Sequence, residues 1–546
     1  MSLSTWAADI IFRCFSSSWM TVSFMGKTYG FFKTSRGLRQ GDPISPTIFI
    51  LMQDPLSRII NKKISTGELL PYRKKMNRPS ISHPMFADDT LIFMNASGRS
   101  VGVLSNILDE YCLWSGQQIN RSKSNIYISN KCGDIQASSL CSSLNMRRGT
   151  FPMVYLGSPI TPGRIRIRDF DSIVNKIVSR VLNWKNHFLS FGGRITLING
   201  VLSAIPIHAF STCKVPKGVL SYIDKVLENF IWDAQTEGNR HWTSWVRLAR
   251  PVYEGGISVR SLTESVHCML ARLAWEVVEE RTLWGKIMSY KDDRFADKVR
   301  NHVSPLWLLI HDMIPKIRQH SRWIIGRGDI SFWHQNWAGS TIGFLGCPAT
   351  LISFREASMY SSFINVVLDK DQREVFDLID LNSDPDKCVF TASSSGNFSI
   401  KDFRRISFPQ GQQDSWNNLI WCDSIPTKLN FLLWRIRNQA VPTDDNVWKM
   451  GISIVSRCHC CRVYNEESSD HLFFEGEWAM AVWRFFGEFT GLLSSELIGA
   501  SFLEKCFHGS ICKGPKKVAR SMILNVGCWC IWQARNRARF EGIYST

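Results

Sequence analysis

The sequence predicts an α+β protein made of several domains, on three observations. Residues 1 to about 160 alternate short strand-like runs, Gly/Pro turns and amphipathic helices. Residues 165 to about 300 carry their apolar side chains at helical spacing. Cysteine and histidine gather between residues 458 and 471, in a compact module that begins near Phe390. Because 546 residues exceed what one hydrophobic core accommodates, we expect roughly two to four domains.

The chain is basic, with 65 Lys and Arg against 47 Asp and Glu and a net charge of +18. A surplus of this size favours polyanionic partners, because contacts with phosphates release counterions. A basic protein without a nucleic-acid role is the alternative. The first residues lack the regions of a signal peptide, and no apolar run reaches the ~18 residues of a membrane span. We therefore expect an intracellular protein with no membrane partner and with reduced cysteines, in the nucleus or the cytoplasm.

The first part of the chain predicts a hairpin and a helix. Met20–Phe24 and Tyr29–Thr34 flank a Gly-containing turn and are expected to pair as a β-hairpin. Ser45 is expected to cap a helix that has Pro46 in its first turn, and Pro55 is expected to kink or interrupt that helix. The apolar face of this helix is expected to contain Ile48, Leu51, Leu56, Ile59 and Ile60.

Two adjacent acids, Asp88 and Asp89, interrupt the strand-like runs Ile81–Met85 and Leu91–Phe93. This pattern predicts a hairpin with both carboxylates at its tip, where they reach solvent. Polymerases use such carboxylates to hold two Mg²⁺ ions, about 3.5–4 Å apart, for nucleotidyl transfer. An ordinary turn is the alternative, because Asp is frequent in turns.

A Gly-rich basic run, from Ser35 to Pro43, precedes the acidic pair by about 45 positions. The run resembles motif B, and Phe86–Asp89 resembles motif C, of the reverse transcriptases of plant LINE-type (non-LTR) retrotransposons. The resemblance implies an RNA-directed DNA polymerase that uses Mg²⁺, deoxynucleotides, an RNA template and a DNA primer or target. It also implies that the template and the incoming nucleotide lie near Arg36, Gly37, Arg39, Gln40 and Gly41.

The resemblance continues downstream. Ser115–Asn120 followed by Lys123 is similar to motif D, in which the lysine acts on the departing pyrophosphate. Tyr155-Leu156-Gly157 is similar to the turn that joins palm to thumb and supports the primer grip. The implied domains are a partial palm at 1–160, a helical thumb and post-thumb region at 161–300, a Trp-rich connector at 301–389, a reverse transcriptase zinc-binding-like domain at 390–485 and a helical C-terminal segment at 486–546.

Two features of the family's polymerase are expected to be missing, the fingers subdomain and one catalytic carboxylate. The family has a third carboxylate upstream of motif B, and Asp9 is the only acid before Gly37. Because Asp88 and Asp89 would leave one ion without its bridging ligand, we expect no polymerase activity from this chain alone. The alternatives are a longer true protein, a non-catalytic nucleic-acid-binding remnant, and a chain that forms no stable protein because a palm without fingers exposes sheet edges and apolar faces.

Cys458 and Cys461 have Cys-x-x-Cys spacing, and His471 adds a third possible zinc ligand. Where the family has a fourth ligand, a cysteine five positions after the histidine, this chain has Gly476. Weak Zn²⁺ binding and a metal-free domain held by its aromatic core are both open. Substitutes for the missing ligand would be Cys460, Glu475 or Glu477.

Three further segments receive simpler interpretations. Asn382–Lys387 is polar and contains a proline, which predicts a linker. Gly326–Asp329 is interpreted as a turn, because no strand and helix flank it as a dinucleotide site requires. The basic stripe from Arg535 to Arg539 is interpreted as a solvated helix face.

Overall fold

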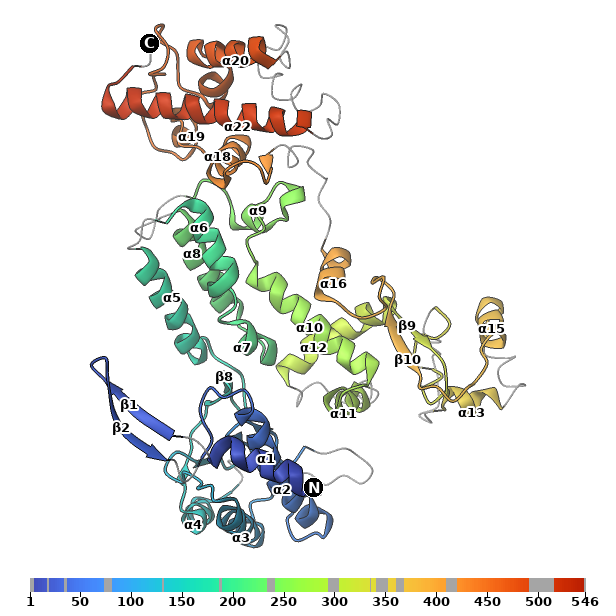
Figure 1. The fold of residues 1–546 in the computed structure, drawn as a ribbon. Coiled ribbons are helices and arrows are strands. Elements are labelled where there is room, and N and C mark those ends of the chain that lie inside the picture. The colour runs from blue at the N-terminus through green and yellow to red at the C-terminus, as the bar shows by residue number, and fades with distance from the viewer. Residues whose placement is uncertain are drawn as a thin grey trace. The chain divides into compact units, whose positions relative to one another are not determined.

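The computed structural model describes residues 4–16, 19–33, 37–72, 81–129, 132–185, 189–232, 241–292, 304–333, 335–339, 352–359, 368–408, 420–490 and 515–544. The chain divides into two compact units. The first comprises Met1–Met153 with Thr282–Asp293, and the second comprises Val154–Arg281 with Arg294–Thr546. Both combine helices with small two-stranded sheets, so the chain is α+β (Figure 1). Within these described ranges, no helix is both long and apolar enough to cross a bilayer.

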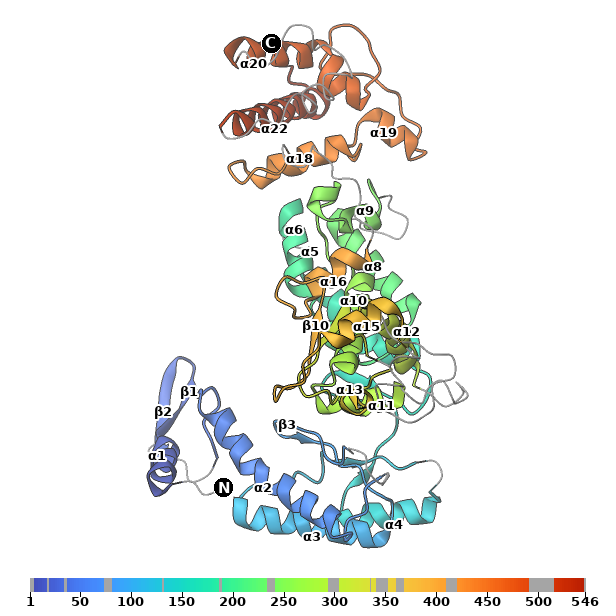
Figure 2. The same ribbon diagram turned by 90° about the vertical axis from the view of Figure 1, so that its right-hand side faces the viewer.

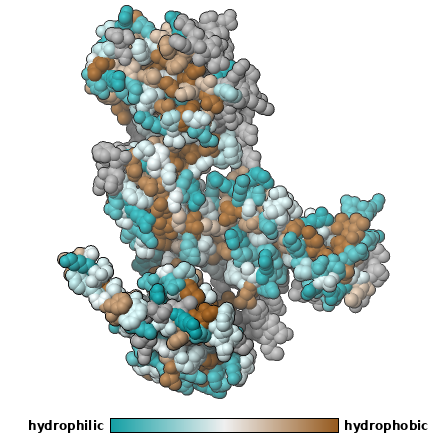
Figure 3. Space-filling view, viewed as in Figure 1, coloured by the Kyte–Doolittle hydropathy of each residue, from teal (hydrophilic) through white to brown (hydrophobic). Residues whose placement is uncertain are grey.

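The first unit opens with helix α1 (Thr5–Ser16) and the predicted hairpin, which is confirmed. Strand β1 (Trp19–Phe24) pairs antiparallel with β2 (Lys27–Lys33). The turn residues Met25 and Gly26 have φ of 50° and 75°, the left-handed values that suit a two-residue hairpin turn. Every residue of both strands is exposed, and the surface of the hairpin mixes hydrophilic and hydrophobic residues (Figure 3).

Helix α2 (Ser45–Ser65) corrects two expectations. The N-cap is Ile44 rather than Ser45, because the backbone is already helical at Ile44, with φ of −83° and ψ of −23°. No side chain caps the helix, and the Ser45 hydroxyl donates a hydrogen bond to the Arg39 carbonyl. The helix is not interrupted at Pro55. Burial of the apolar face on both sides of the proline outweighs the lost backbone hydrogen bond. That face is confirmed by its buried residues, Ile48, Leu56 and Ile60.

The core of the first unit lies between α2, α3 (Gly98–Ser115) and α4 (Asp134–Leu144), of which α3 and α4 lie side by side (Figure 2). Its buried residues are Leu56, Ile60, Leu69, Val101, Leu104, Ile107, Leu108, Tyr111, Leu140 and Leu144. The remaining elements are β3 (Met85–Phe86) with β4 (Asp89–Thr90), β5 (Asn125–Ile126) with β6 (Arg147–Arg148), and α11 (Leu283–Asp292).

The second unit begins as a helical array, as predicted from spacing. After β7 (Met153–Tyr155) and β8 (Ser158–Ile160) come η1 (Ile167–Phe170), α5 (Asp171–Lys185), α6 (Phe191–Leu197), η2 (Ile198–Leu202), α7 (Ile207–Thr212), α8 (Lys217–Trp232), α9 (Trp245–Ala249), η3 (Val252–Glu254) and α10 (Leu262–Glu279). The predicted helical spacing of apolar residues is confirmed on α5, where Ile173, Ile177 and Val181 are buried. On α8 the same holds for Ile223, Leu227, Phe230 and Ile231.

A small sheet follows, with β9 (Ser321–Ile324) paired antiparallel to β10 (Lys387–Phe390). The elements around it are α12 (Pro305–Gln319), α13 (Phe354–Ser358), α15 (Lys370–Asp377) and α16 (Ile400–Ser407). The linker prediction for Asn382–Lys387 is wrong, because this segment is bound to the chain that follows β9. The Asp386 carboxylate accepts hydrogen bonds from the backbone N–H groups of Gly326, Gly328, Asp329 and Ile330. Gly326–Asp329 is therefore a turn, as predicted.

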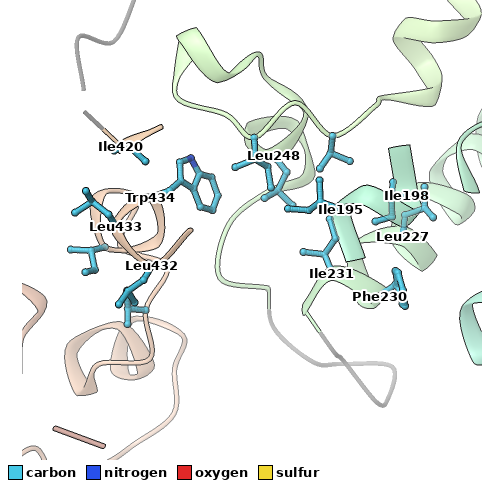
Figure 4. Packing of buried hydrophobic residues seen from close by; sticks show 14 of the residues in the cluster. Ile195, Ile198, Leu227, Phe230, Ile231, Leu248, Ile420, Leu432, Leu433 and Trp434 are labelled. Atoms are coloured by element: carbon cyan, nitrogen blue, oxygen red, sulfur yellow. The ribbon is translucent and has the colours of Figure 1, made fainter. Parts of the chain in front are cut away.

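The last part of the second unit contains α18 (Thr427–Arg437), α19 (Asp444–Lys449), η5 (His471–Glu475), α20 (Glu477–Thr490), α22 (Pro515–Asn536) and η6 (Arg537–Glu541). Its core is continuous with that of the helical array (Figure 4). Leu432, Leu433 and Trp434 of α18 belong to the same buried cluster as Ile195 of α6 and Leu248 of α9. The Trp434 indole N–H also donates to the Gly255 carbonyl at 2.9 Å.

The C-terminal helix contradicts the interpretation of its basic stripe as a solvated face. Arg535 is buried against Glu467, and Arg539 bonds to Asp444, whereas Arg537 is exposed. Two of the three basic side chains thus point into the module, because buried carboxylates there compensate their charge.

Candidate functional site

The two adjacent acids lie in a tight hairpin, as the apolar runs around them predicted. Phe86 of β3 pairs with Asp89 of β4, and Ala87 and Asp88 form the turn. The ladder extends beyond the strands through bonds from Leu91 N to Pro84 O (3.0 Å) and from Phe93 N to Ser82 O (2.7 Å). Ala87 has a φ of 47°, in the left-handed region used by such turns.

Both carboxylates are exposed and, among the described residues, neither makes a hydrogen bond or ion pair. Most other acids of residues 1–153 are engaged. The ion pairs are Asp9–Arg13, Asp54–Arg58, Glu68–Lys63, Asp109–Arg121 and Asp134–Arg148. Adjacent carboxylates without protein partners can accept a hard divalent cation through their oxygens.

The acidic hairpin is attached to α2. The Gln53 side-chain amide donates to the carbonyl of Ala87, in the turn itself, at 2.7 Å. Further down the hairpin, the His83 ring bonds to the Ser57 hydroxyl through Nε2 (2.8 Å) and to the Ser82 hydroxyl through Nδ1 (2.7 Å). Burial lowers the pKa of His83, which favours the neutral ring that both hydroxyls contact.

The Gly-rich run leads directly into the same helix. Gly37 and Gly41 have φ of 87° and 92°, conformations that glycine adopts without strain. The Asp42 carboxylate accepts from Ile44 N at 3.1 Å and so closes the turn before α2. Arg39 and Gln40 are exposed on this loop, and Arg36 lies outside the described residues. Helix α2 is therefore the common support of the loop and the acidic hairpin.

The other two predicted segments, at Lys123 and at Tyr155–Gly157, are each part of a turn. Lys123 is exposed in a turn closed by Asn120, whose side chain accepts from Lys123 N at 3.1 Å. No hydrogen bond or ion pair among the described residues joins Lys123 to Asp88 or Asp89. Tyr155-Leu156-Gly157 spans β7 and the turn before β8, with φ of 49° at Leu156 and 79° at Gly157.

The structure brings Cys458, Cys461 and His471 together in the second unit. The Cys458 and Cys461 sulfurs are 3.7 Å apart, and Cys461 Sγ is 3.3 Å from His471 Nε2. All three ligand atoms lie within 4.8 Å of one another. Both cysteines are buried, and burial raises the pKa of the Cys461 thiol to about 11. Deprotonation of the Cys461 thiol at neutral pH thus requires a nearby positive charge, which a bound cation supplies.

These distances fit one face of a zinc site. A tetrahedral ion with the usual Zn–S and Zn–N bonds holds two sulfurs about 3.8 Å apart, and a sulfur and a nitrogen about 3.6 Å apart. Gly476, the position of the missing ligand, borders the same group. A Cβ built on Gly476 would lie 3.2 Å from Cys461 Sγ and 3.3 Å from His471 Nε2.

The substitutes suggested by the sequence do not join this group. Within the described ranges, the set of ligand atoms in mutual reach contains Cys458, Cys461 and His471 without Cys460, Glu475 or Glu477. The Glu477 carboxylate instead accepts from Arg462 N at 3.0 Å, and Glu475 is exposed. Sequence reasoning also missed Gln53, because a glutamine on a helix gives no signal of a contact 34 positions away.

Comparisons with known proteins match the two parts of the chain that contain these candidate sites. A family model described as reverse transcriptase (RNA-dependent DNA polymerase) matches residues 3–160, and one described as zinc-binding in reverse transcriptase matches residues 398–483. An uncharacterized mitochondrial protein of Arabidopsis thaliana is 37% identical over 106 residues, which are 19% of this chain and 83% of that protein. An A. thaliana protein described as a ribonuclease H protein is 25% identical over 337 residues.

The second match covers 56% of this chain and 54% of the relative, so the chain spans about half the length of that protein. The acidic hairpin and the Gly-rich run lie inside the first matched range, and the Cys/His group lies inside the second. The chain therefore belongs to the plant retrotransposon-type reverse transcriptases.

Proposed function

We propose that this chain takes part in RNA-directed DNA synthesis by a non-LTR (LINE-type) retrotransposon, with Asp88 and Asp89 as Mg²⁺ ligands. The observation that carries the proposal is the hairpin turn, which exposes two adjacent carboxylates that no described residue neutralises. In such a site, Mg²⁺ stabilises the attacking 3′-hydroxyl of a primer and the departing pyrophosphate.

The other residues receive roles around this pair. Gly37, Arg39, Gln40 and Gly41 are exposed on the loop before α2, which supports their contact with template and nucleotide, and Arg36 is proposed for the same role. Lys123 is proposed to act on the pyrophosphate. The Tyr155–Gly157 turn is proposed to support the primer.

We further propose that nucleotidyl transfer needs a carboxylate in addition to Asp88 and Asp89, so that the chain alone does not polymerise. Asp9, Asp54 and Asp109 are each engaged by an arginine. In the described ranges, no third Asp or Glu forms with both acids a group of ligand atoms that all lie within 4.8 Å of one another. Loss of such a ligand commonly removes several kcal/mol of transition-state stabilisation, roughly 3–4 kcal/mol for a single electrostatic contact.

Primer extension on an RNA template with Mg²⁺ tests the proposal. The unaltered chain and the Asp88→Ala, Asp89→Ala double variant are compared, with Glu110→Ala as a control that removes another exposed carboxylate. We expect no product from any of them. Product from the unaltered chain and from Glu110→Ala, but not from the double variant, would show that the third ligand is present and would overturn the proposed inactivity.

A second candidate function, nucleic-acid binding without chemistry, is favoured by the net charge of +18. Binding of this kind falls steeply with salt, because it depends on counterion release. Fluorescence anisotropy with a labelled RNA–DNA duplex distinguishes the two. Binding that weakens with salt but ignores both Mg²⁺ and the double substitution would favour this candidate.

We also propose that Cys458, Cys461 and His471 hold Zn²⁺. The support is the pair of distances at Cys461, which fit a tetrahedral ion, and the burial of both sulfurs. When bound, the ion would cross-link the loop that contains Cys458 to η5, which contains His471. Zinc content of the purified chain, compared with a Cys461→Ser variant, tests this assignment.

A further inference from the structure

We propose that the metal site at Cys458, Cys461 and His471 has an open fourth coordination position, which an exogenous nitrogen or sulfur donor can occupy. The inference rests on the proposed binding of zinc by these three residues. It departs from a closed structural site, which has four protein ligands. Sites with two cysteines and one histidine that keep the fourth position for water or another ligand are chemically feasible.

The first step of the argument is the orientation of position 476. Gly476 is buried and has φ of −67° and ψ of 155°, values that any residue adopts. A Cβ there would approach Cys461 Sγ and His471 Nε2 to within 3.2 and 3.3 Å. A side chain at this position would therefore point into the ligand group. Because glycine has no side chain, residue 476 provides no metal ligand at this position.

The second step concerns the other donors nearby. Within the part of the chain that the structure describes, only Cys458, Cys461 and His471 bring ligand atoms into mutual reach. Glu477 is committed to Arg462 N, and the neighbouring Cys460 is not a member of the group. The Cys460 thiol contacts that of Cys458 but does not lie in mutual reach of the whole group, so we assign the fourth ligand to a donor outside these side chains.

The third step concerns charge. Two ionised thiols and a neutral imidazole balance the charge of a divalent ion, so the fourth ligand need not be anionic. Neutral donors such as imidazole, and soft donors such as thiols, suit an ion that already has nitrogen and sulfur ligands. We therefore assign the open position to a small nitrogen or sulfur donor.

Cobalt substitution tests the inference on the full chain. The chain is freed of metal under a non-coordinating reductant and titrated with Co²⁺, whose visible absorption reports coordination. Imidazole is then added as the probe ligand. We expect a saturable spectral change in the unaltered chain. In Gly476→Cys we expect stronger sulfur-to-cobalt charge-transfer absorption, no response to imidazole and tighter binding of Co²⁺, because a fourth protein ligand closes the site.

Three variants serve as controls. Gly476→Ala introduces the same Cβ, which lies 2.9 Å from the His471 carbonyl, but no donor, so it should show no added charge-transfer band. Cys461→Ser should lose Co²⁺, and Cys460→Ser should keep both Co²⁺ and the imidazole response. Cobalt binding that ignores imidazole would overturn the open position and indicate a fourth ligand from the protein. Failure of the unaltered chain to bind Co²⁺ would overturn both the open position and the assignment of a zinc site. Primer extension tests the proposed polymerase function separately.

Discussion

The Arg535 guanidinium meets the Glu467 carboxylate with Nε 3.2 and 3.0 Å from its two oxygens, although the residues are 68 positions apart. The exposed fractions of the two residues are 2% and 1%. Arg535 also donates to the Pro442 carbonyl at 3.2 Å, and Arg539 donates to Glu467 at 3.3 Å. The C-terminal helix α22 is thereby joined to the module that carries the Cys/His group.

Replacement of Glu467 by glutamine should destabilise this module strongly. The substitution leaves the buried Arg535 charge without its counter-charge, and breaking such a pair costs about 3–5 kcal/mol. Chemical denaturation followed by tryptophan fluorescence measures the change in unfolding free energy. Arg537→Gln, on the exposed side of the same segment, should change it by less than about 0.5 kcal/mol. Equal effects of the two substitutions would refute a structural role for the buried pair.

Sequence patterns predicted the features that depend on residues close together in the sequence. The apolar runs around Asp88 and Asp89 predict a hairpin, and Cys-x-x-Cys spacing predicts that Cys458 and Cys461 approach each other. Long-range polar contacts have no such signal. Arg535 and Arg537 look alike in the sequence, and the groups that Arg535 contacts when buried, the Glu467 carboxylate and the Pro442 carbonyl, lie far along the chain.

The same limitation explains the remaining errors. The helical backbone begins at Ile44, one residue before Ser45, and the loop conformation that places the Ser45 hydroxyl against the Arg39 carbonyl has no signal in the sequence. Asn382–Lys387 has the composition of a linker, but Asp386 binds backbone donors some 60 positions earlier. Gly476 could be recognised as a departure from the family pattern, whereas the direction in which its side chain would point required the structure.

Removal of the Gln53 side-chain amide should loosen the acidic turn. Gln53→Leu deletes the hydrogen bond to Ala87 O, and a bond of this kind contributes about 0.5–1.5 kcal/mol. Hydrogen exchange should become faster at the amides of Asp88 and Asp89. Gln136→Leu is a matched control, since Gln136 donates to the Ala96 carbonyl in the same unit. Faster hydrogen exchange at the turn in both variants would show that the effect of Gln53→Leu comes from general destabilisation of the unit.

Substitution of Asp386 by alanine should disrupt the turn that its carboxylate organises. Four backbone N–H groups, those of Gly326, Gly328, Asp329 and Ile330, would lose their acceptor. Net contributions of hydrogen bonds to a charged group are about 1.5–3 kcal/mol each, and water can replace the acceptor at this partly exposed site, so we expect a loss of about 2–3 kcal/mol rather than the sum of four bonds. Thermal unfolding measures it. Asp384→Ala removes an exposed carboxylate two residues away, and a comparable loss there would contradict the proposed role.

Stability should depend on pH through Asp224 of α8. Burial, and then the charge of Glu228, raises the pKa of Asp224 from 3.8 to about 6. The folded chain therefore holds this proton more tightly than the unfolded chain. The resulting stabilisation is present below pH 4 and is lost as the pH rises through about 6. Asp224→Asn, which stays neutral, should reduce that fall and be relatively more stable at pH 7 than at pH 4.5. Urea denaturation at both values measures the difference, and an unchanged pH dependence in the variant would exclude Asp224 as its source.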